Sequence, residues 1–147
     1  MGDTGYAAPD FMHMLELASQ GFQCAQILMI LALEAEEKEN SDLVCAVGGL
    51  NLGLSDASGP CGALTGGCCF ISYFAGKGDE VEMESPAYKD MLTEFAAWFR
   101  AEFGSQICTD ILGGDARNMN KRCPGIVQAS YLKIMEILEK NDLAIDG

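Results

Sequence analysis

Cysteine thiols are the side chains in this sequence that are best suited to chemistry. Seven cysteines occur among 147 residues, and an odd number leaves at least one thiol unpaired in any scheme of disulfides. A thiolate is a nucleophile, a metal ligand and one half of a reversible disulfide. The cysteines are therefore the first candidates for a functional site.

The spacing of the cysteines excludes several familiar sites. No Cys-x-x-Cys pair occurs, which argues against a thioredoxin-type motif and against a zinc ribbon. Covalent c-type haem needs Cys-x-x-Cys-His and is excluded for the same reason. The only histidine, His13, stands between Met12 and Met14, and we expect it to be a partly exposed or core residue rather than a ligand.

The elements that must position these thiols are helices. Hydrophobic residues recur at helical spacing along residues 86–103 and 124–138, and no hairpin or repeat is evident. We expect an all-α fold, a compact single-domain bundle of about six helices that takes in residues 1–147. The predicted helical segments cover residues 9–18, 23–38, 43–50, 60–76, 86–103, 105–112 and 124–141. Six side chains are expected to share one core: Phe95, Trp98, Phe99, Ile126, Tyr131 and Ile134.

Four of the cysteines fall where predicted helices begin: Cys24, Cys61, Cys108 and Cys123. A helix N-terminus has free N–H groups and a partial positive charge, and both stabilise a thiolate. We expect these four cysteines to converge in space. Cys123 precedes Pro124 and follows the cluster Arg117, Lys121 and Arg122, so it is predicted to be the most nucleophilic thiol.

The other three cysteines lie inside predicted helices. Cys45, Cys68 and Cys69 have apolar neighbours, and free cysteine is a common small core residue. We interpret all three as structural. For Cys68 we also keep a second interpretation, as a resolving thiol, because it lies two helical turns after Cys61 on roughly the same face.

Composition narrows the range of functions. The formal net charge of −13 opposes binding to nucleic acid. The apolar segments 24–33 and 61–76 are shorter than the ~20 residues that span a bilayer, so no membrane insertion is expected. The N-terminal ten residues do not resemble a signal peptide. We therefore expect a cytoplasmic protein whose cysteines are thiols unless they are redox-active or bind metal.

Four sequence elements, taken in order, resemble the C_GCAxxG_C_C family, a group described as redox-active and named for its cysteine pattern. They read GFQCAQ at 21–26, PCGALTGG at 60–67, CTDILG at 108–113 and CPGIV at 123–127. The resemblance covers about residues 21–130. The second element reads Cys-Gly-Ala-x-x-Gly, a slight departure from the family name. A similar domain occurs in split-Soret cytochromes, but this chain lacks their haem-attachment motif, so no haem role carries over.

The resemblance implies a helical domain with four motif cysteines, which by position are Cys24, Cys61, Cys108 and Cys123. We expect a thiol-based redox protein that uses these four as catalytic residues, in electron transfer or as an accessory to another redox protein. Two alternatives stay open. The same four thiolates would suit zinc or an iron–sulfur cluster, or the chain is a non-catalytic helical interaction module with buried cysteines. The sequence does not indicate whether the protein is an enzyme, which substrate it uses or what its oligomeric state is.

Overall fold

The computed structural model describes residues 11–143, so Pro9, the predicted start of the first helix, lies outside the described residues. Within that range the all-α prediction is confirmed, with seven α helices and no strand. The helices are α1 (Phe11–Ser19), α2 (Cys24–Ala35), α3 (Ser41–Val47), α4 (Gly62–Ala75), α5 (Tyr88–Phe103), α6 (Cys108–Ile111) and α7 (Met119–Lys140). Short 3₁₀ or π-type turns cover Gly48–Leu50, Gly53–Ala57 and Ala116–Asn118.

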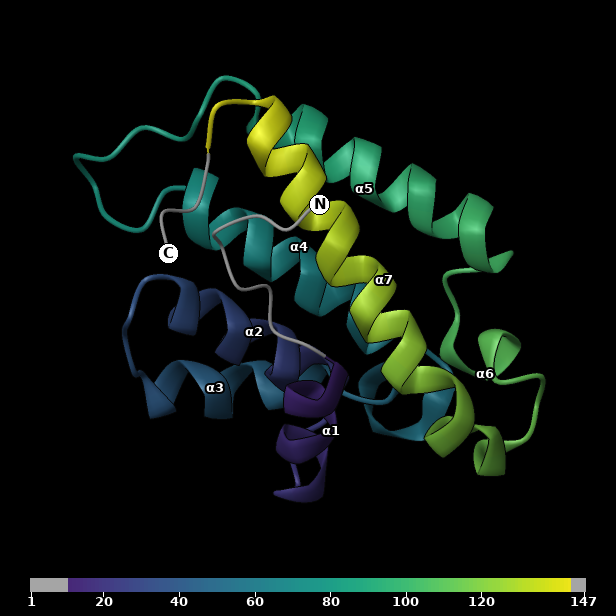
Figure 1. The fold of residues 1–147 in the computed structure, drawn as a ribbon. Coiled ribbons are helices and arrows are strands. Elements are labelled where there is room, and N and C mark those ends of the chain that lie inside the picture. The colour runs from purple at the N-terminus through teal and green to yellow at the C-terminus, as the bar shows by residue number, and fades with distance from the viewer. Residues whose placement is uncertain (1–10, 144–147) are drawn as a thin grey trace.

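Helix α4 is the centre of the bundle. It packs against α2, α5 and α7, while α3 lies along α2 and α1 contacts both α2 and α7 (Figure 1). The first three helices thus form one side of the molecule, and α5 with α7 forms the other. This arrangement brings the starts of α2, α4, α6 and α7 to one end of the bundle, although they are far apart in the sequence.

The core lies between α4, α5 and α7. Phe95, Phe99, Tyr131 and Ile134 are essentially inaccessible to solvent and Ile126 is nearly so, as predicted. Trp98 differs, because it is only half-buried at the margin of this core. Its ring stacks on Phe95 at a centroid distance of 5.9 Å and meets the edge of Phe103 at 5.7 Å.

Glycine permits α2 and α4 to pack closely. A Cβ atom at Gly66 would lie 2.6 Å from the Cα atom of Ala25, and one at Gly67 would lie 2.5 Å from the ring of Phe95. Neither position has room for a methyl group. Gly66 therefore permits the close contact of α4 with α2, which fixes the start of α2 beside the start of α4, and Gly67 permits the close contact of α4 with α5.

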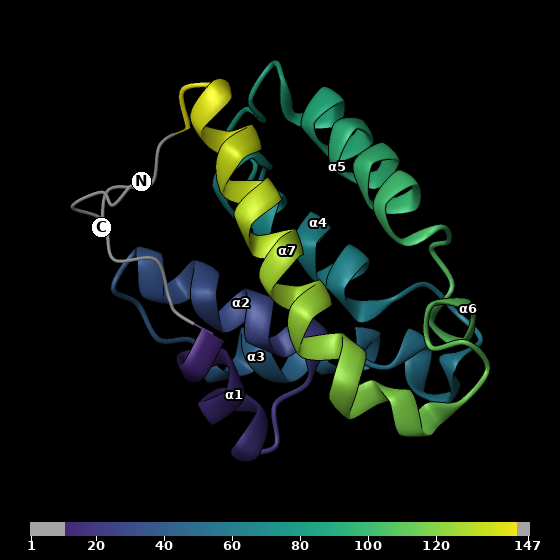
Figure 2. The same ribbon diagram turned by 45° about the vertical axis from the view of Figure 1, so that its right-hand side comes forward.

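The last helix begins earlier than the sequence predicts. We expected it to start at Pro124, but α7 starts at Met119 and contains Pro124 in its second turn. An interior proline removes one helical hydrogen bond and bends the helix. Figure 2 shows the first turns of α7 running across the end of the bundle before the helix rises along α4 and α5. Among all the described helices, none is both long enough and apolar enough to cross a membrane.

Candidate thiol site

One pocket of about 370 Å³ is lined by all four motif cysteines, Cys24, Cys61, Cys108 and Cys123. Its walls come from α1, from the starts of α2, α4 and α6, and from the first turns of α7. All seven cysteines of the chain are free thiols. The structure thus brings together four residues that are distributed over most of the sequence, and we name this cavity the thiol pocket.

A short β-bridge holds Cys61 and Cys108. Pro60 pairs with Ile107 in antiparallel fashion, the Cys61 N–H donates to the Gln106 carbonyl at 2.7 Å, and the Cys108 N–H donates to the Gly59 carbonyl at 2.9 Å. This pairing places both cysteines on the same face of the bridge in diagonal positions, which are typically roughly 7–8 Å apart. The bridge thus fixes the start of α4 beside the start of α6.

The side chain of Asn51 connects the segment before α4 to the start of α2 by hydrogen bonds. Its Oδ1 accepts the N–H groups of Ala25 at 3.0 Å and Gln26 at 3.4 Å, and its Nδ2 donates to the Gln26 side chain at 3.0 Å. These amides are among those that a helix N-terminus offers to a thiolate. Asn51 therefore occupies two of the N–H groups at the start of α2.

The loop that follows Asn51 is strained. Leu52, Leu54, Ser55 and Ala57 all have positive φ angles, a conformation that costs roughly 1–2 kcal/mol for a non-glycine residue. Gly53 shares this conformation, and a Cβ atom there would lie 2.7 Å from the Cβ of Cys108. Backbone strain of this kind concentrates at functional sites, and here it places Leu52 in the wall of the thiol pocket.

Gly62 makes room for the sulfur of Cys24. A Cβ atom at Gly62 would clash with that sulfur and would approach the Leu50 carbonyl within 3.1 Å. Cys24 is the first residue of α2, and Cys61, directly before Gly62, is the N-cap of α4. The missing side chain at Gly62 therefore lets the two helix starts, with their cysteines, face the same cavity.

Burial raises the pKa of three of the pocket thiols, those of Cys61, Cys108 and Cys123. Burial raises the pKa of Cys61 to about 12. The backbone N–H groups of Ala63 and Leu64 oppose this rise with a smaller effect, because they favour the thiolate. The Cys61 side chain does not form a capping hydrogen bond with them. Burial also raises the pKa of Cys123 to about 12 and that of Cys108 above its usual value. A negative charge on Cys24 raises the pKa of all three further.

Cys123 is not at the N-cap of the last helix, so that part of the prediction is wrong. Cys123 lies inside α7, and its pKa rises because burial and the other three thiols disfavour the thiolate. Two of its three expected cationic neighbours have other partners. Arg117 pairs with Asp115 at 2.8 Å, and Arg122 donates to the Ile111 carbonyl at the end of α6 at 2.6 Å.

The remaining cysteines lie away from the pocket. Cys45 is exposed on α3 and is not a buried core residue. Cys68 and Cys69 are half-buried against the core, which fits a structural role, and neither lines the thiol pocket. Cys68 is therefore not placed to resolve a disulfide at Cys61 within this cavity. Burial, followed by the charge of Cys69, raises its pKa to about 11.

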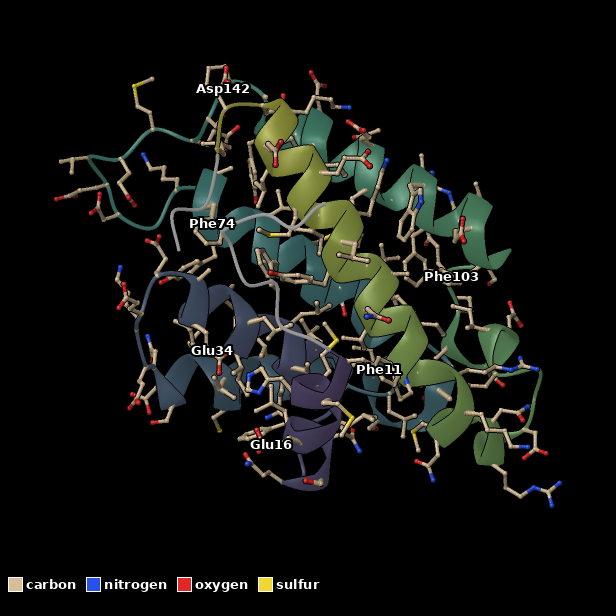
Figure 3. The ribbon with its side chains drawn as sticks, in the orientation of Figure 1. Phe11, Glu16, Glu34, Phe74, Phe103 and Asp142 are labelled. Atoms are coloured by element: carbon tan, nitrogen blue, oxygen red, sulfur yellow. The ribbon has the colours of Figure 1, made fainter. Side chains whose placement is uncertain are left out.

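His13 belongs to a different part of the surface. It is half-buried and hydrogen-bonds Glu34 at 2.9 Å and Glu16 at 3.3 Å, so it ties α1 to α2. Figure 3 labels both glutamates, one on each helix. A wider groove of about 790 Å³ adjoins this contact between α1, α2 and α3. It includes Cys45 but none of the four motif cysteines, so the smaller thiol pocket is the better candidate for the site.

Sequence reasoning missed the residues that shape this pocket. Asn51 and Leu52 stand in a stretch that reads only as a polar, glycine-rich loop, and their roles depend on long-range contacts. Met119 and Asn120 line the pocket because α7 starts before Pro124. The Gly62-x-x-x-Gly66 spacing was the one available signal, since it indicates a close approach between helices.

The metal alternative was tested against the geometry of the donor groups. Across residues 11–143, no group of three or more histidine, cysteine, aspartate or glutamate side chains is arranged to hold a metal ion. The four cysteines line one cavity, but no three of them are grouped so as to hold a metal ion.

The fold and the site together define a class: a helical protein with four thiols around a small cavity. The model of the C_GCAxxG_C_C family, described as "Putative redox-active protein", matches residues 22–137, and the chain belongs to this family. No curated protein and no solved structure gave a significant match to the chain.

Proposed function

We propose that the protein carries out thiol–disulfide exchange with the four cysteines of the thiol pocket. The supporting observation is that one cavity is lined by four cysteines from separate parts of the chain, Cys24, Cys61, Cys108 and Cys123. A family described as redox-active is consistent with this use of the thiols. Burial of reduced cysteines without disulfides would also suit a structural role, so the test must measure electron exchange.

Cys24 is the residue that we propose as the attacking thiol. Cys24 is half-buried and lines the cavity, and its sulfur lies against Gly62, which has no side chain. Once Cys24 has lost its proton, its charge raises the pKa of the other three cysteines. The site would then hold one thiolate for attack and neutral thiols that supply a proton to the leaving sulfur. The electron partner we propose is another redox couple, for which this protein acts as an accessory.

Redox titration with thiol counting tests this function. The anaerobically reduced protein is equilibrated in buffers of reduced and oxidised dithiothreitol, its free thiols are counted, and the oxidised peptides are mapped. We expect loss of two or four thiols, all from the four pocket cysteines. Cys24→Ser should prevent the first step, whereas Cys45→Ser should have no effect.

Two outcomes would contradict the proposal. If the pocket cysteines stay reduced at every potential while Cys45, Cys68 or Cys69 oxidise, the pocket is not a disulfide site. If the purified protein contains stoichiometric metal that protects all four thiols, the same residues serve as ligands. Metal analysis and visible absorbance of the anaerobic sample belong in the same experiment.

A further inference from the structure

We propose that the thiol pocket selects small, uncharged disulfides and excludes charged ones. This inference rests on the proposed thiol–disulfide function and names the class of substrate for it. It derives from three features of the cavity: the absence of charge in its lining, its size, and the difference between its mouth and its floor.

The lining of the thiol pocket is uncharged as far as the structure describes it. Beside the four cysteines it consists of apolar side chains and two amides, those of Gln23 and Asn120. In this chain 21% of residues are charged, yet none of the described residues that line the pocket carries a charge. A charged group that entered would lose its water without gaining a counter-charge, which is strongly unfavourable.

The volume of the pocket limits the substrate further. Ligand pockets commonly measure about 300–1,000 Å³, so a cavity of about 370 Å³ is at the small end of that range. A disulfide with two short aliphatic arms is compatible with this space. A disulfide of two peptides would have to leave most of its atoms outside.

The mouth and the floor of the pocket differ in character. Ala18, Gln23 and Asn120 are exposed and form the mouth, where the two amides offer hydrogen bonds to a neutral polar group. Ile27 and Val127 are buried and form the floor beside Cys61. A molecule that is apolar around its S–S bond and weakly polar at its ends matches both regions.

The proposed reaction balances as follows. The Cys24 thiolate attacks one sulfur of R–S–S–R, breaks that bond and releases R–S⁻, which takes a proton from a second pocket thiol. The second cysteine sulfur then attacks the mixed disulfide at Cys24 and releases another R–S⁻, which is protonated by solvent. The substrate is reduced to two R–SH molecules, and two cysteines are oxidised to one protein disulfide.

Three small disulfides of different charge test the selection. Oxidation of the reduced protein is followed with neutral 2-hydroxyethyl disulfide, dicationic cystamine and dianionic 3,3′-dithiodipropionate. Each rate is divided by the rate for the same protein in urea, which removes differences in intrinsic reactivity. We expect this ratio to be at least about tenfold higher for the neutral disulfide than for either charged one, a difference of roughly 1.4 kcal/mol.

A substitution at the mouth provides a second readout. Asn120→Asp changes the charge there with almost no change in shape, and it should raise the cystamine ratio several-fold while lowering that of dithiodipropionate. Thr93→Asp on α5 alters the net charge equally at an exposed position that does not line the pocket, and it should leave all three ratios unchanged.

The outcomes separate this inference from the proposed function. Equal ratios for the three disulfides, or a ratio highest for cystamine, would overturn the selection, because the pocket would not be excluding charge. An equal response to Asn120→Asp and Thr93→Asp would overturn it as well. If none of the three disulfides oxidises the pocket cysteines, the proposed function itself fails.

Discussion

At the scale of single residues, solvent access decides how each thiol reacts. Thiolates react and thiols do not, so a group whose pKa is raised from 9.0 to about 12 presents about a thousandfold less thiolate at neutral pH. Cys61 and Cys123 both have a pKa raised in this way. Cys45, by contrast, is exposed on α3.

We therefore predict the order of alkylation in the folded protein. With substoichiometric iodoacetamide at pH 7.5, Cys45 should be modified at nearly the rate of the unfolded chain. Cys61 and Cys123 should react slower by about 10²–10³-fold, because burial suppresses both their thiolate form and their access to reagent. Peptide mapping at several times measures the order.

The same reaction in urea serves as the control, since all seven cysteines should then be modified at similar rates. Early modification of Cys123 in the folded protein would contradict the structure and would restore the view that helix position and nearby cations set its reactivity. Cys45→Ser should remove the fast phase without changing the slow one.

The sequence singled out the four cysteines that line the thiol pocket, but it did not predict the surroundings of each one. The motif and the predicted helix starts indicated Cys24, Cys61, Cys108 and Cys123, and three of them do lie at the start of a helix. The position of Arg122 next to Cys123 in the sequence did not predict which group the arginine side chain would bind. Arg122 reaches a carbonyl of α6 instead of Cys123, and only the three-dimensional arrangement shows this.

At the scale of helices, the crossing of α2 and α4 is the contact that positions the site. Gly66 touches the backbone of Ala25, one residue after Cys24, and a backbone atom cannot move aside as a flexible side chain can. Any separation of the two helices would widen the thiol pocket. The pocket geometry therefore depends on glycine at this crossing.

We predict that Gly66→Ala destabilises the protein by about 1–3 kcal/mol, the usual cost of overpacking. Urea unfolding of the reduced protein measures the change. Gly125→Ala is the matched control, because Gly125 is helical in α7 and has nothing within 4 Å of the added methyl group. Helix propensity alone should then stabilise that variant by up to about 1 kcal/mol. Equal effects of the two substitutions would show that the crossing tolerates a methyl group.

Helix patterns were readable from sequence where local signals are strong. Asn40 caps α3 by accepting a hydrogen bond from the Leu43 N–H, and asparagine is one of the residue types preferred at this position. The start of α7 was not readable, because proline usually opens a helix and here lies within one. The left-handed turn around Leu54 was equally hidden, because four non-glycine residues there have positive φ angles, which their residue types do not predict.

At the scale of the whole molecule, the buried thiols couple folding to pH. A thiol whose pKa is higher in the folded state than in the unfolded chain binds its proton more tightly when folded. Its contribution to stability is complete below the unfolded pKa of roughly 8.5 and is lost as pH rises through the folded value. Three thiols therefore lower the stability as the pH rises. Their folded pKa values are about 12 for Cys61 and Cys123 and about 11 for Cys68.

We predict that the free energy of unfolding falls between about pH 8.5 and pH 11, by up to roughly 1.4 kcal/mol per pH unit for each such thiol. Urea unfolding at closely spaced pH values, with a phosphine reductant present, measures the slope. Cys61→Ser should make the slope shallower by about one thiol, because serine does not ionise in this range and preserves the N-cap of α4. Cys45→Ser should leave the slope unchanged, since this side chain is exposed in the folded protein. A wild-type slope that Cys61→Ser does not alter would mean that the Cys61 thiol ionises as readily in the folded pocket as in the unfolded chain, and that the cavity is open to water.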